Sequence, residues 1–203
     1  MAEPSKSSLP NLLSAARILL MPTALVVALA ESKFWFVVLL ATALLTDVLD
    51  GFLARRLGAE SEMGRKLDSA ADYLTLLTGL AGIALLWPEI MHRELPWVAS
   101  GLMMFFAVIV YGFVRLGRAP CYHTWIAKVA AMACGLSLVP LLTAWSAAPL
   151  HWAMALQILG GFEELAIIYL VPWHSGEVPT IWHAWRLWRQ RAKSTSASRE
   201  GGS

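Results

Sequence analysis

The chain has 203 residues, of which 58% are hydrophobic, ten are tryptophan and only 15% are charged. This composition differs from that of a soluble globular domain and predicts an all-α, polytopic integral membrane protein, because helices satisfy their own backbone hydrogen bonds in lipid. The formal net charge of +2 is too small to indicate a nucleic-acid partner.

Six apolar stretches are predicted to cross the membrane as helices. In chain order they cover about residues 11–30, 34–56, 64–86, 97–116, 125–145 and 149–171. The first carries Arg17, which we interpret as an anchor at the lipid–water interface because it lies close to a helix end. The polar stretch PEIMHREL predicts a loop before the fourth span. No small-residue cleavage site follows the first apolar stretch, so we expect no removed signal peptide.

The last thirty residues, 174–203, predict a basic tail that is separate from a six-helix domain spanning residues 1–173. Ile181, Trp182, Trp185 and Trp188 recur at helical spacing with arginines between them, which is typical of a short interfacial helix. From Ser194 onward the tail is rich in serine and glycine and is predicted to be disordered.

The distribution of basic residues predicts the orientation of the chain. Six spans place both termini on one side, and of the 16 lysines and arginines only Lys33 and Arg93 fall on the other side. Cytoplasmic loops carry the excess of basic residues, so both termini are predicted to be cytoplasmic.

Four aspartates stand out within the second and third spans. Asp47 and Asp50 are three residues apart, and Asp68 and Asp72 are four apart, so each pair shares a helical face. The short turn between the two spans makes them antiparallel neighbours. We therefore expect the four carboxylates to converge at the cytoplasmic end of these helices.

Such a cluster needs compensating charge, and three solutions are open. A hard divalent cation, Mg²⁺ or Mn²⁺, suits an oxygen-only set that lacks the His and Cys that Zn²⁺ prefers. A structural charge network is the second, and an ion or proton path, as in transporters, is the third. The basic residues available to such a network are Arg55, Arg56, Arg65 and Lys66. Gly51, Ala54 and Gly64 leave room for a ligand, or serve close helix packing.

The complete pattern also resembles the signature of a known family. Asp47-x-x-Asp50-Gly51-x-x-Ala54-Arg55, eight residues, then Gly64-x-x-x-Asp68-x-x-x-Asp72 is similar to the motif of the CDP-alcohol phosphotransferases at all eight positions. Pro10-Asn11-Leu12, with Arg17 and Pro22 after it, resembles the opening of the phosphatidyltransferase branch, which includes phosphatidylglycerophosphate synthases.

This resemblance implies an enzyme of phospholipid biosynthesis in the bacterial inner membrane, with its site facing the cytoplasm. Such an enzyme transfers a phosphatidyl group from CDP-diacylglycerol to a small alcohol, such as glycerol 3-phosphate, and releases CMP. It implies Mg²⁺ or Mn²⁺ on Asp47, Asp50, Asp68 and Asp72, with Asp72 also acting as the base. Gly51, Ala54, Arg55 and Gly64 would line the nucleotide slot, and the chain would form a homodimer.

Other functions remain open at this stage. Within the family, the donor could instead be CDP-choline or CDP-ethanolamine, with diacylglycerol as acceptor. From other classes, a cation transporter would use the aspartates as its transport site, and a membrane scaffold would use them for stability alone. Release of CMP that depends on a divalent metal separates the enzyme from both.

Residues outside the motif bear on the acceptor. Arg115 and Lys128 predict an anion pocket, although they also fit anchors at lipid head groups. Glu163 and Glu164 lie within an apolar helix and need partners; a Glu contact with the acceptor would argue against a glycerol phosphate. Cys121 and Cys134 are interpreted as packing residues, and none of the five histidines is assigned to a metal.

Overall fold

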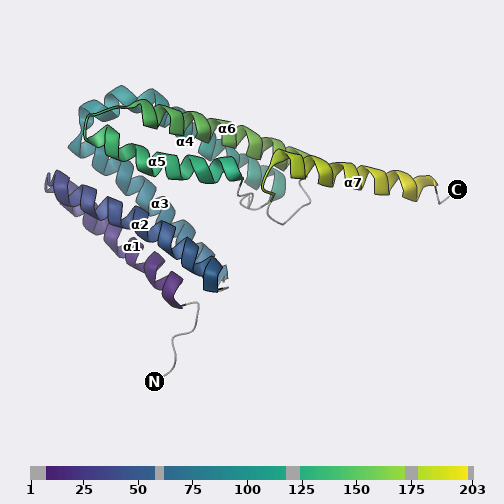
Figure 1. Ribbon diagram of the computed structural model, residues 1–203, viewed down its shortest axis with the longest axis horizontal. Coiled ribbons are helices and arrows are strands. Elements are labelled where there is room, and N and C mark those ends of the chain that lie inside the picture. The colour runs from purple at the N-terminus through teal and green to yellow at the C-terminus, as the bar shows by residue number, and fades with distance from the viewer. Residues whose placement is uncertain (1–7, 58–61, 118–123, 172–177, 201–203) are drawn as a thin grey trace, which may run out of the picture. The chain divides into compact units, whose positions relative to one another are not determined.

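The computed structural model describes residues 8–57, 62–117, 124–171 and 178–200, and these are helical apart from short turns (Figure 1). The all-α fold class is therefore confirmed. The helices are α1 (Ser8–Leu29), α2 (Lys33–Leu57), α3 (Glu62–Leu86), α4 (Pro88–Leu116), α5 (Trp125–Leu142), α6 (Ala148–Leu170) and α7 (Ile181–Glu200).

The described chain divides into two compact units at Arg93 and Glu94, within α4. The first unit holds α1 to α3, and the second holds most of α4 together with α5, α6 and α7. The boundary expected near residue 173, between a membrane domain and a tail, stays a prediction.

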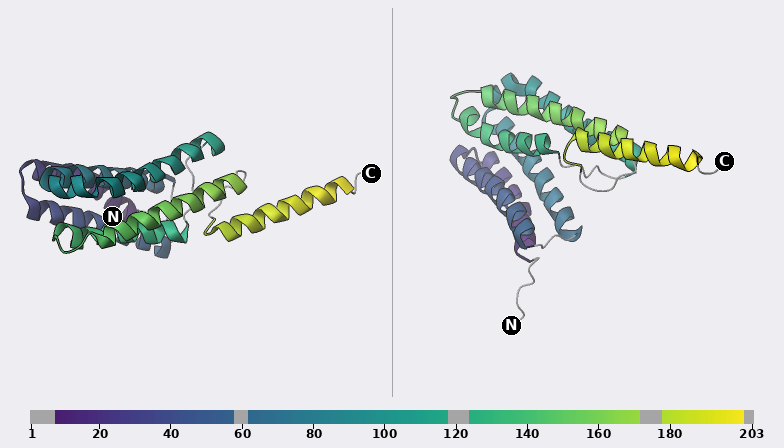
Figure 2. Two further views of the ribbon diagram at one scale, coloured as in Figure 1. Left: turned by 90° about the horizontal axis from the view of Figure 1, so that it is seen from above. Right: turned by 45° about the vertical axis from the view of Figure 1, so that its right-hand side comes forward.

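In the first unit, α1 packs along both α2 and α3 (Figure 2). Small buried residues, including Ala24, Ala43 and Ala71, allow these backbones to approach closely. Gly82 of α3 lies against the buried ring of Phe36 in α2, and a Cβ at Gly82 would overlap that ring. This close packing holds α2 beside α3 and so fixes the two helices that carry the aspartates.

In the second unit, α5 and α6 are packed together, and α6 also contacts α4 and α7. Gly160 of α6 faces the backbone of α5, where an added Cβ would lie 3.4 Å from the Ala127 nitrogen. Gly161 faces Met104 of α4. A buried cluster then joins α4, α6 and the start of α7 through Val108, Ile167, Ile168, Val171, Val178 and Ala184.

Five helices of the described chain are long and apolar enough to cross a membrane. Their candidate spans are Leu12–Leu29, Lys66–Leu86, Pro88–Leu116, Trp125–Leu142 and Ala148–Leu170. Many large apolar side chains on these helices are exposed, among them Leu19, Val114 and Leu136, as expected of surfaces that face lipid. α2, which corresponds to the second of the six predicted spans, is not among these five.

The loop predicted over PEIMHREL is wrong, because α4 begins at Pro88 and continues through this stretch. Proline is well tolerated in the first turn of a helix, where its missing N–H costs nothing. The buried Glu94 is paired with His151 Nε2 of α6 at 2.6 Å, and the Trp97 ring stacks on His151. The local sequence could not indicate this pairing, because Glu94 and His151 are 57 residues apart.

α7 continues to Glu200, beyond Ser194, from which the sequence predicts disorder. The partly disordered tail stays a prediction. Extending an existing helix costs far less free energy than starting one, so the segment can follow the Trp- and Arg-rich turns before it.

Candidate active site

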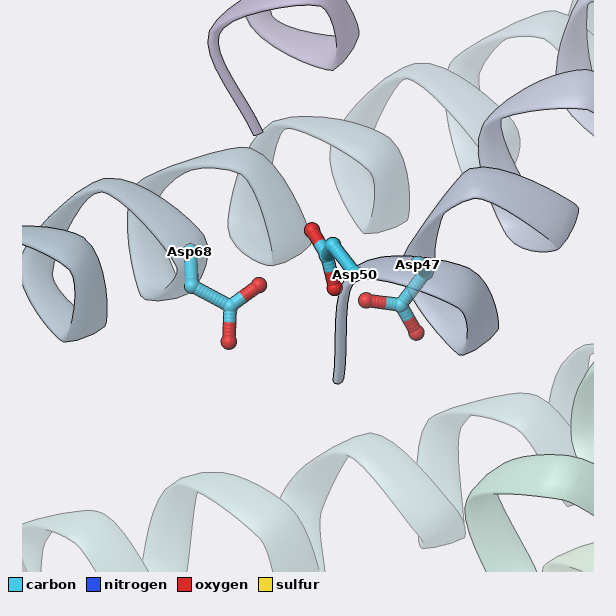
Figure 3. A group of neighbouring side chains, drawn as sticks. All are labelled: Asp47, Asp50 and Asp68. Atoms are coloured by element: carbon cyan, nitrogen blue, oxygen red, sulfur yellow. The ribbon is translucent and has the colours of Figure 1, made fainter. Parts of the chain in front are cut away.

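The aspartates of α2 and α3 come together as their spacing predicts. Asp47, Asp50 and Asp68 each offer a carboxylate oxygen, and these oxygens lie within 4.8 Å of one another. Figure 3 shows the three carboxyl groups converging from the two helices. Asp72 lies one turn after Asp68 on α3.

Arg17 of α1 contacts all four aspartates. Its Nη1 donates to Asp47 Oδ1 and, at 2.9 Å, to Asp72 Oδ1. Its Nη2 donates to Asp50 Oδ2 at 2.8 Å and to Asp68 Oδ1 at 2.7 Å. The interpretation of Arg17 as an interfacial anchor is therefore wrong, because the side chain is buried among the carboxylates of two neighbouring helices.

Ser14 supports this arrangement from the same helix. Its hydroxyl donates to Asp50 Oδ2 at 3.0 Å, so Asp50 receives hydrogen bonds from both Ser14 and Arg17. The two residues are three apart and share one face of α1. The sequence held one signal of this arrangement: Ser14 and Arg17 lie on one face of an otherwise apolar helix, and polar groups away from water need partners.

Burial changes sharply across the cluster. The side chains of Arg17 and Asp50 are 1% and 5% exposed, whereas those of Asp47, Asp68 and Asp72 are 44%, 46% and 53% exposed. Arg17 and Asp50 thus form a buried floor, and the other three carboxylates are accessible from outside. This gradient leaves an acidic surface that a polar or charged ligand can reach.

The residues fit a hard divalent cation. The donor set consists of carboxylate oxygens, which Mg²⁺ and Mn²⁺ prefer, and three of them already cluster at ligand spacing. One guanidinium offsets one of four carboxylate charges, so the cluster keeps a formal charge of −3 when all are ionised. Arg17 and the four aspartates thus form a charge network, and the negative charge that remains on the aspartates can be balanced by a metal ion.

Comparison with known proteins places the chain in a family. The family model described as CDP-alcohol phosphatidyltransferase matches residues 7–162, which include the whole aspartate motif and Arg17. The chain belongs to the CDP-alcohol phosphatidyltransferase family. No solved structure gave a significant match.

Three bacterial relatives of this CDP-alcohol phosphatidyltransferase show how far the similarity extends. The cardiolipin synthase (CMP-forming) of Streptomyces coelicolor is 35% identical over 61% of this chain and 59% of its own length. The CDP-diacylglycerol–glycerol-3-phosphate 3-phosphatidyltransferase of Aquifex aeolicus is 43% identical over 32% of this chain and 36% of its own. A probable phosphatidylglycerophosphate synthase of Mycobacterium tuberculosis is 29% identical over 72% and 71%.

The predicted nucleotide slot of this family member is only partly described. Gly51, Ala54 and Arg55 belong to α2 directly after Asp50, but their side chains lie outside the described part of the chain. Gly64 lies in the first turn of α3 and is partly buried. Their role in holding the nucleotide stays a prediction.

Arg115 and Lys128, predicted to bind an anion, are both exposed and belong to the second unit. Arg115 is in the last turn of α4, and Lys128 is in the first turn of α5 with its Nζ 5.6 Å from the centre of the Trp125 ring. Their part in an anion pocket also stays a prediction.

Glu163 has a partner that the sequence did not indicate. Its Oε1 accepts a hydrogen bond from the backbone N–H of Ile181 at 3.0 Å, which caps the first turn of α7. Glu164, its neighbour, is partly buried in α6. The structure therefore gives Glu163 a structural partner within the chain.

Proposed function

We propose that this family member transfers a phosphatidyl group from CDP-diacylglycerol to an alcohol and releases CMP. The observation that carries the proposal is the convergence of four motif aspartates on a site that is buried on one side and accessible on the other. The name of the Aquifex relative supports CDP-diacylglycerol as the donor.

Asp47, Asp50 and Asp68, with Asp72 beside them, would hold Mg²⁺ or Mn²⁺. When bound, a divalent cation supplies positive charge at the donor pyrophosphate and stabilises the charge that develops on the departing CMP. Arg17 keeps the carboxylates close together through its four contacts, and Ser14 fixes Asp50. The protein thus holds the carboxylates in place before a metal or donor binds.

Asp72 is the proposed general base. Among the described residues it lies outside the trio of closest oxygens and has the most exposed carboxyl of the four. The acceptor hydroxyl gives its proton to Asp72 while its oxygen bonds to the phosphorus that carries diacylglycerol. The bond from that phosphorus to CMP breaks, and CMP leaves. Such proton transfer typically contributes ~10² to 10⁴ in rate.

The remaining motif residues would form the donor slot. Gly51 and Gly64 allow the cytidine nucleotide to approach the backbone closely, and Ala54 and Arg55 complete the slot. Arg115 and Lys128 would bind a phosphate of the donor or acceptor, because basic side chains form strong, charge-assisted hydrogen bonds to phosphate oxygens.

The acceptor is proposed to be a small alcohol, with glycerol 3-phosphate the first candidate. The names of the relatives support glycerol 3-phosphate in one case and point to cardiolipin formation in another, while a Bacillus subtilis relative is named for serine. We also propose six spans with both termini in the cytoplasm, residence in the inner membrane and a homodimer. The basic-residue distribution supports the orientation.

The acceptor panel is the test of this proposal. The purified chain is incubated with CDP-diacylglycerol, Mn²⁺ and one acceptor at a time: glycerol 3-phosphate, serine or phosphatidylglycerol. CMP and the lipid product of each reaction are identified by mass spectrometry. We expect CMP and one new phospholipid with one acceptor, and neither with the Asp68→Asn variant. CMP release that forms no lipid product with any acceptor would reject phosphatidyl transfer.

A further inference from the structure

Helix α7 carries aromatic and basic side chains along one side. At helical spacing, one half of its circumference holds Ile181, Trp182, Trp185, Arg186, Trp188 and Arg189, which we call the Trp–Arg face. Ile181, Trp182 and Trp188 are 43%, 54% and 45% exposed. Large apolar side chains thus remain exposed on this side of α7.

The arginines of this face are held beside its rings. The Arg189 guanidinium lies 4.0 Å from the centre of the Trp185 ring, and that of Arg186 lies 5.6 Å from the centre of the Trp182 ring. The two rings are themselves 5.0 Å apart. Rings and cations therefore form one continuous surface. The sequence from Val178 to Arg199 contains no acidic residue, so the face has a net positive charge.

The start of α7 is fixed at the end of α6. Val178 and Ala184 are buried against Ile167, Ile168 and Val171, and the Pro179 carbonyl accepts a hydrogen bond from the Trp125 N–H at 3.2 Å. The Glu163 carboxylate caps the N–H of Ile181. Because α6 is long and apolar enough to cross a membrane, α7 begins where that helix ends, at the level of the lipid head groups.

We propose that the first turns of α7, at the level of the lipid head groups, bind anionic phospholipids through the Trp–Arg face. The tryptophan rings occupy the interface between head groups and acyl chains, where their apolar bodies and N–H groups are both satisfied. The arginines contact lipid phosphates, to which a positively charged surface is attracted. Ala184 and Leu187 on another side keep the helix attached to the bundle. This inference does not depend on the catalytic activity.

The test measures the depth of α7 in vesicles with the full-length chain. Cys121→Ala and Cys134→Ala remove the native thiols, and a fluorophore is attached at Trp188→Cys on the Trp–Arg face or at Gln190→Cys, an exposed position away from it. Vesicles contain phospholipids brominated in the acyl chain, either zwitterionic alone or with one third phosphatidylglycerol. In the anionic vesicles we expect quenching at position 188 to exceed that at 190 by about threefold.

Two controls test the role of charge. Replacing Arg186→Gln and Arg189→Gln together, or adding high salt, should reduce quenching at position 188 by about half or more, because the attraction is electrostatic. Equal quenching at positions 188 and 190, or quenching at 188 that is the same in both vesicle types and in the double variant, would overturn the proposal. Self-quenching between labelled copies without lipid quenching would assign the face to a second copy of the chain and also overturn it.

Discussion

Arg17 sets the charge balance of the candidate site. It is buried, it reaches carboxylates from two other helices, and it neutralises only part of their charge. A buried ion pair of this kind is weak evidence for net stability, but removing one partner leaves uncompensated charge and is costly. Arg17 therefore allows the four aspartates to assemble, and it leaves them with enough negative charge to attract a cation.

Replacing Arg17 should destabilise the protein strongly. Arg17→Met keeps the apolar stem but removes the positive charge, which leaves the aspartates uncompensated. We expect the unfolding free energy to fall by about 3 kcal/mol. The loss is at the lower end of the range for buried ion pairs, because three of the four carboxylates retain partial access to water. Thermal unfolding in detergent with a chelator present measures the change. Arg115→Gln, an exposed arginine in the second unit, is the matched control. An unchanged melting temperature for Arg17→Met would mean that the four contacts carry no stabilising role.

The Asp72→Asn variant separates catalysis from binding. The amide cannot accept the hydroxyl proton, so turnover should fall by at least ~10². Binding of CDP-diacylglycerol should persist, because Asp47, Asp50 and Asp68 remain. Calorimetric titration of the donor, beside CMP release, measures both quantities. A variant that loses donor binding together with turnover would show that Asp72 serves the donor and is not simply the base.

At the residue scale, the sequence predicted what spacing controls and missed what distant contacts control. Asp47, Asp50, Asp68 and Asp72 could be grouped because two helices joined by a short turn must be neighbours. Arg17 could not be assigned, since its partners lie 30 to 55 residues away and an Arg near a helix end has a simpler explanation in lipid. Glu163 was missed for the same reason, because its partner is a backbone group of another helix.

At the scale of helices, close approach of backbones positions the site. Gly82 allows α3 to pack on Phe36 of α2, so the two helices that carry the aspartates stay together. Helix boundaries were predicted less well. α4 begins before Trp97 and continues through Glu94, because this buried carboxylate finds a partner in His151 and so does not need to face water at a helix end.

Two glycines one turn apart on α3 provide a test of this packing. Gly82→Ala should destabilise the protein by about 1–3 kcal/mol, because the methyl group overlaps the buried Phe36 ring. Gly79→Ala meets only Leu40 Cδ1 at 3.6 Å, an ordinary contact, and should be neutral or stabilising by about 0.5–1 kcal/mol. Melting temperatures of the two variants measure the difference. Equal effects would show that α2 and α3 are not closely packed at Gly82.

At the scale of the whole molecule, composition alone determined the class. Long apolar helices with exposed apolar surfaces indicate a multi-pass membrane protein, and the family match agrees with the aspartate motif. Composition could not position the aspartates relative to Arg115 and Lys128, because that arrangement depends on how helices of two units assemble. The identity of the acceptor could not be predicted from the sequence either, because it depends on the same assembly of helices.

Metal binding should stabilise the assembled chain. A ligand that binds the folded state raises the unfolding free energy by about 2.7 kcal/mol at a concentration 100 times its dissociation constant. We therefore expect the melting temperature to rise as Mn²⁺ is titrated, and the rise to be much smaller for Asp68→Asn. For each protein, the melting temperature with Mn²⁺ is compared with that of the same protein in chelator. This comparison removes the effect of the substitution on stability. The same Mn²⁺ increment in both proteins would exclude the aspartates as the ligands.

Release of CMP from CDP-diacylglycerol by the purified chain is the most direct measurement of the central claim. The account predicts that release requires both an acceptor alcohol and Mg²⁺ or Mn²⁺, stops when a chelator is added and resumes when the metal is restored. No CMP release under any of these conditions, together with uptake of Mn²⁺ into vesicles that contain the chain, would contradict the enzyme and identify a cation transporter.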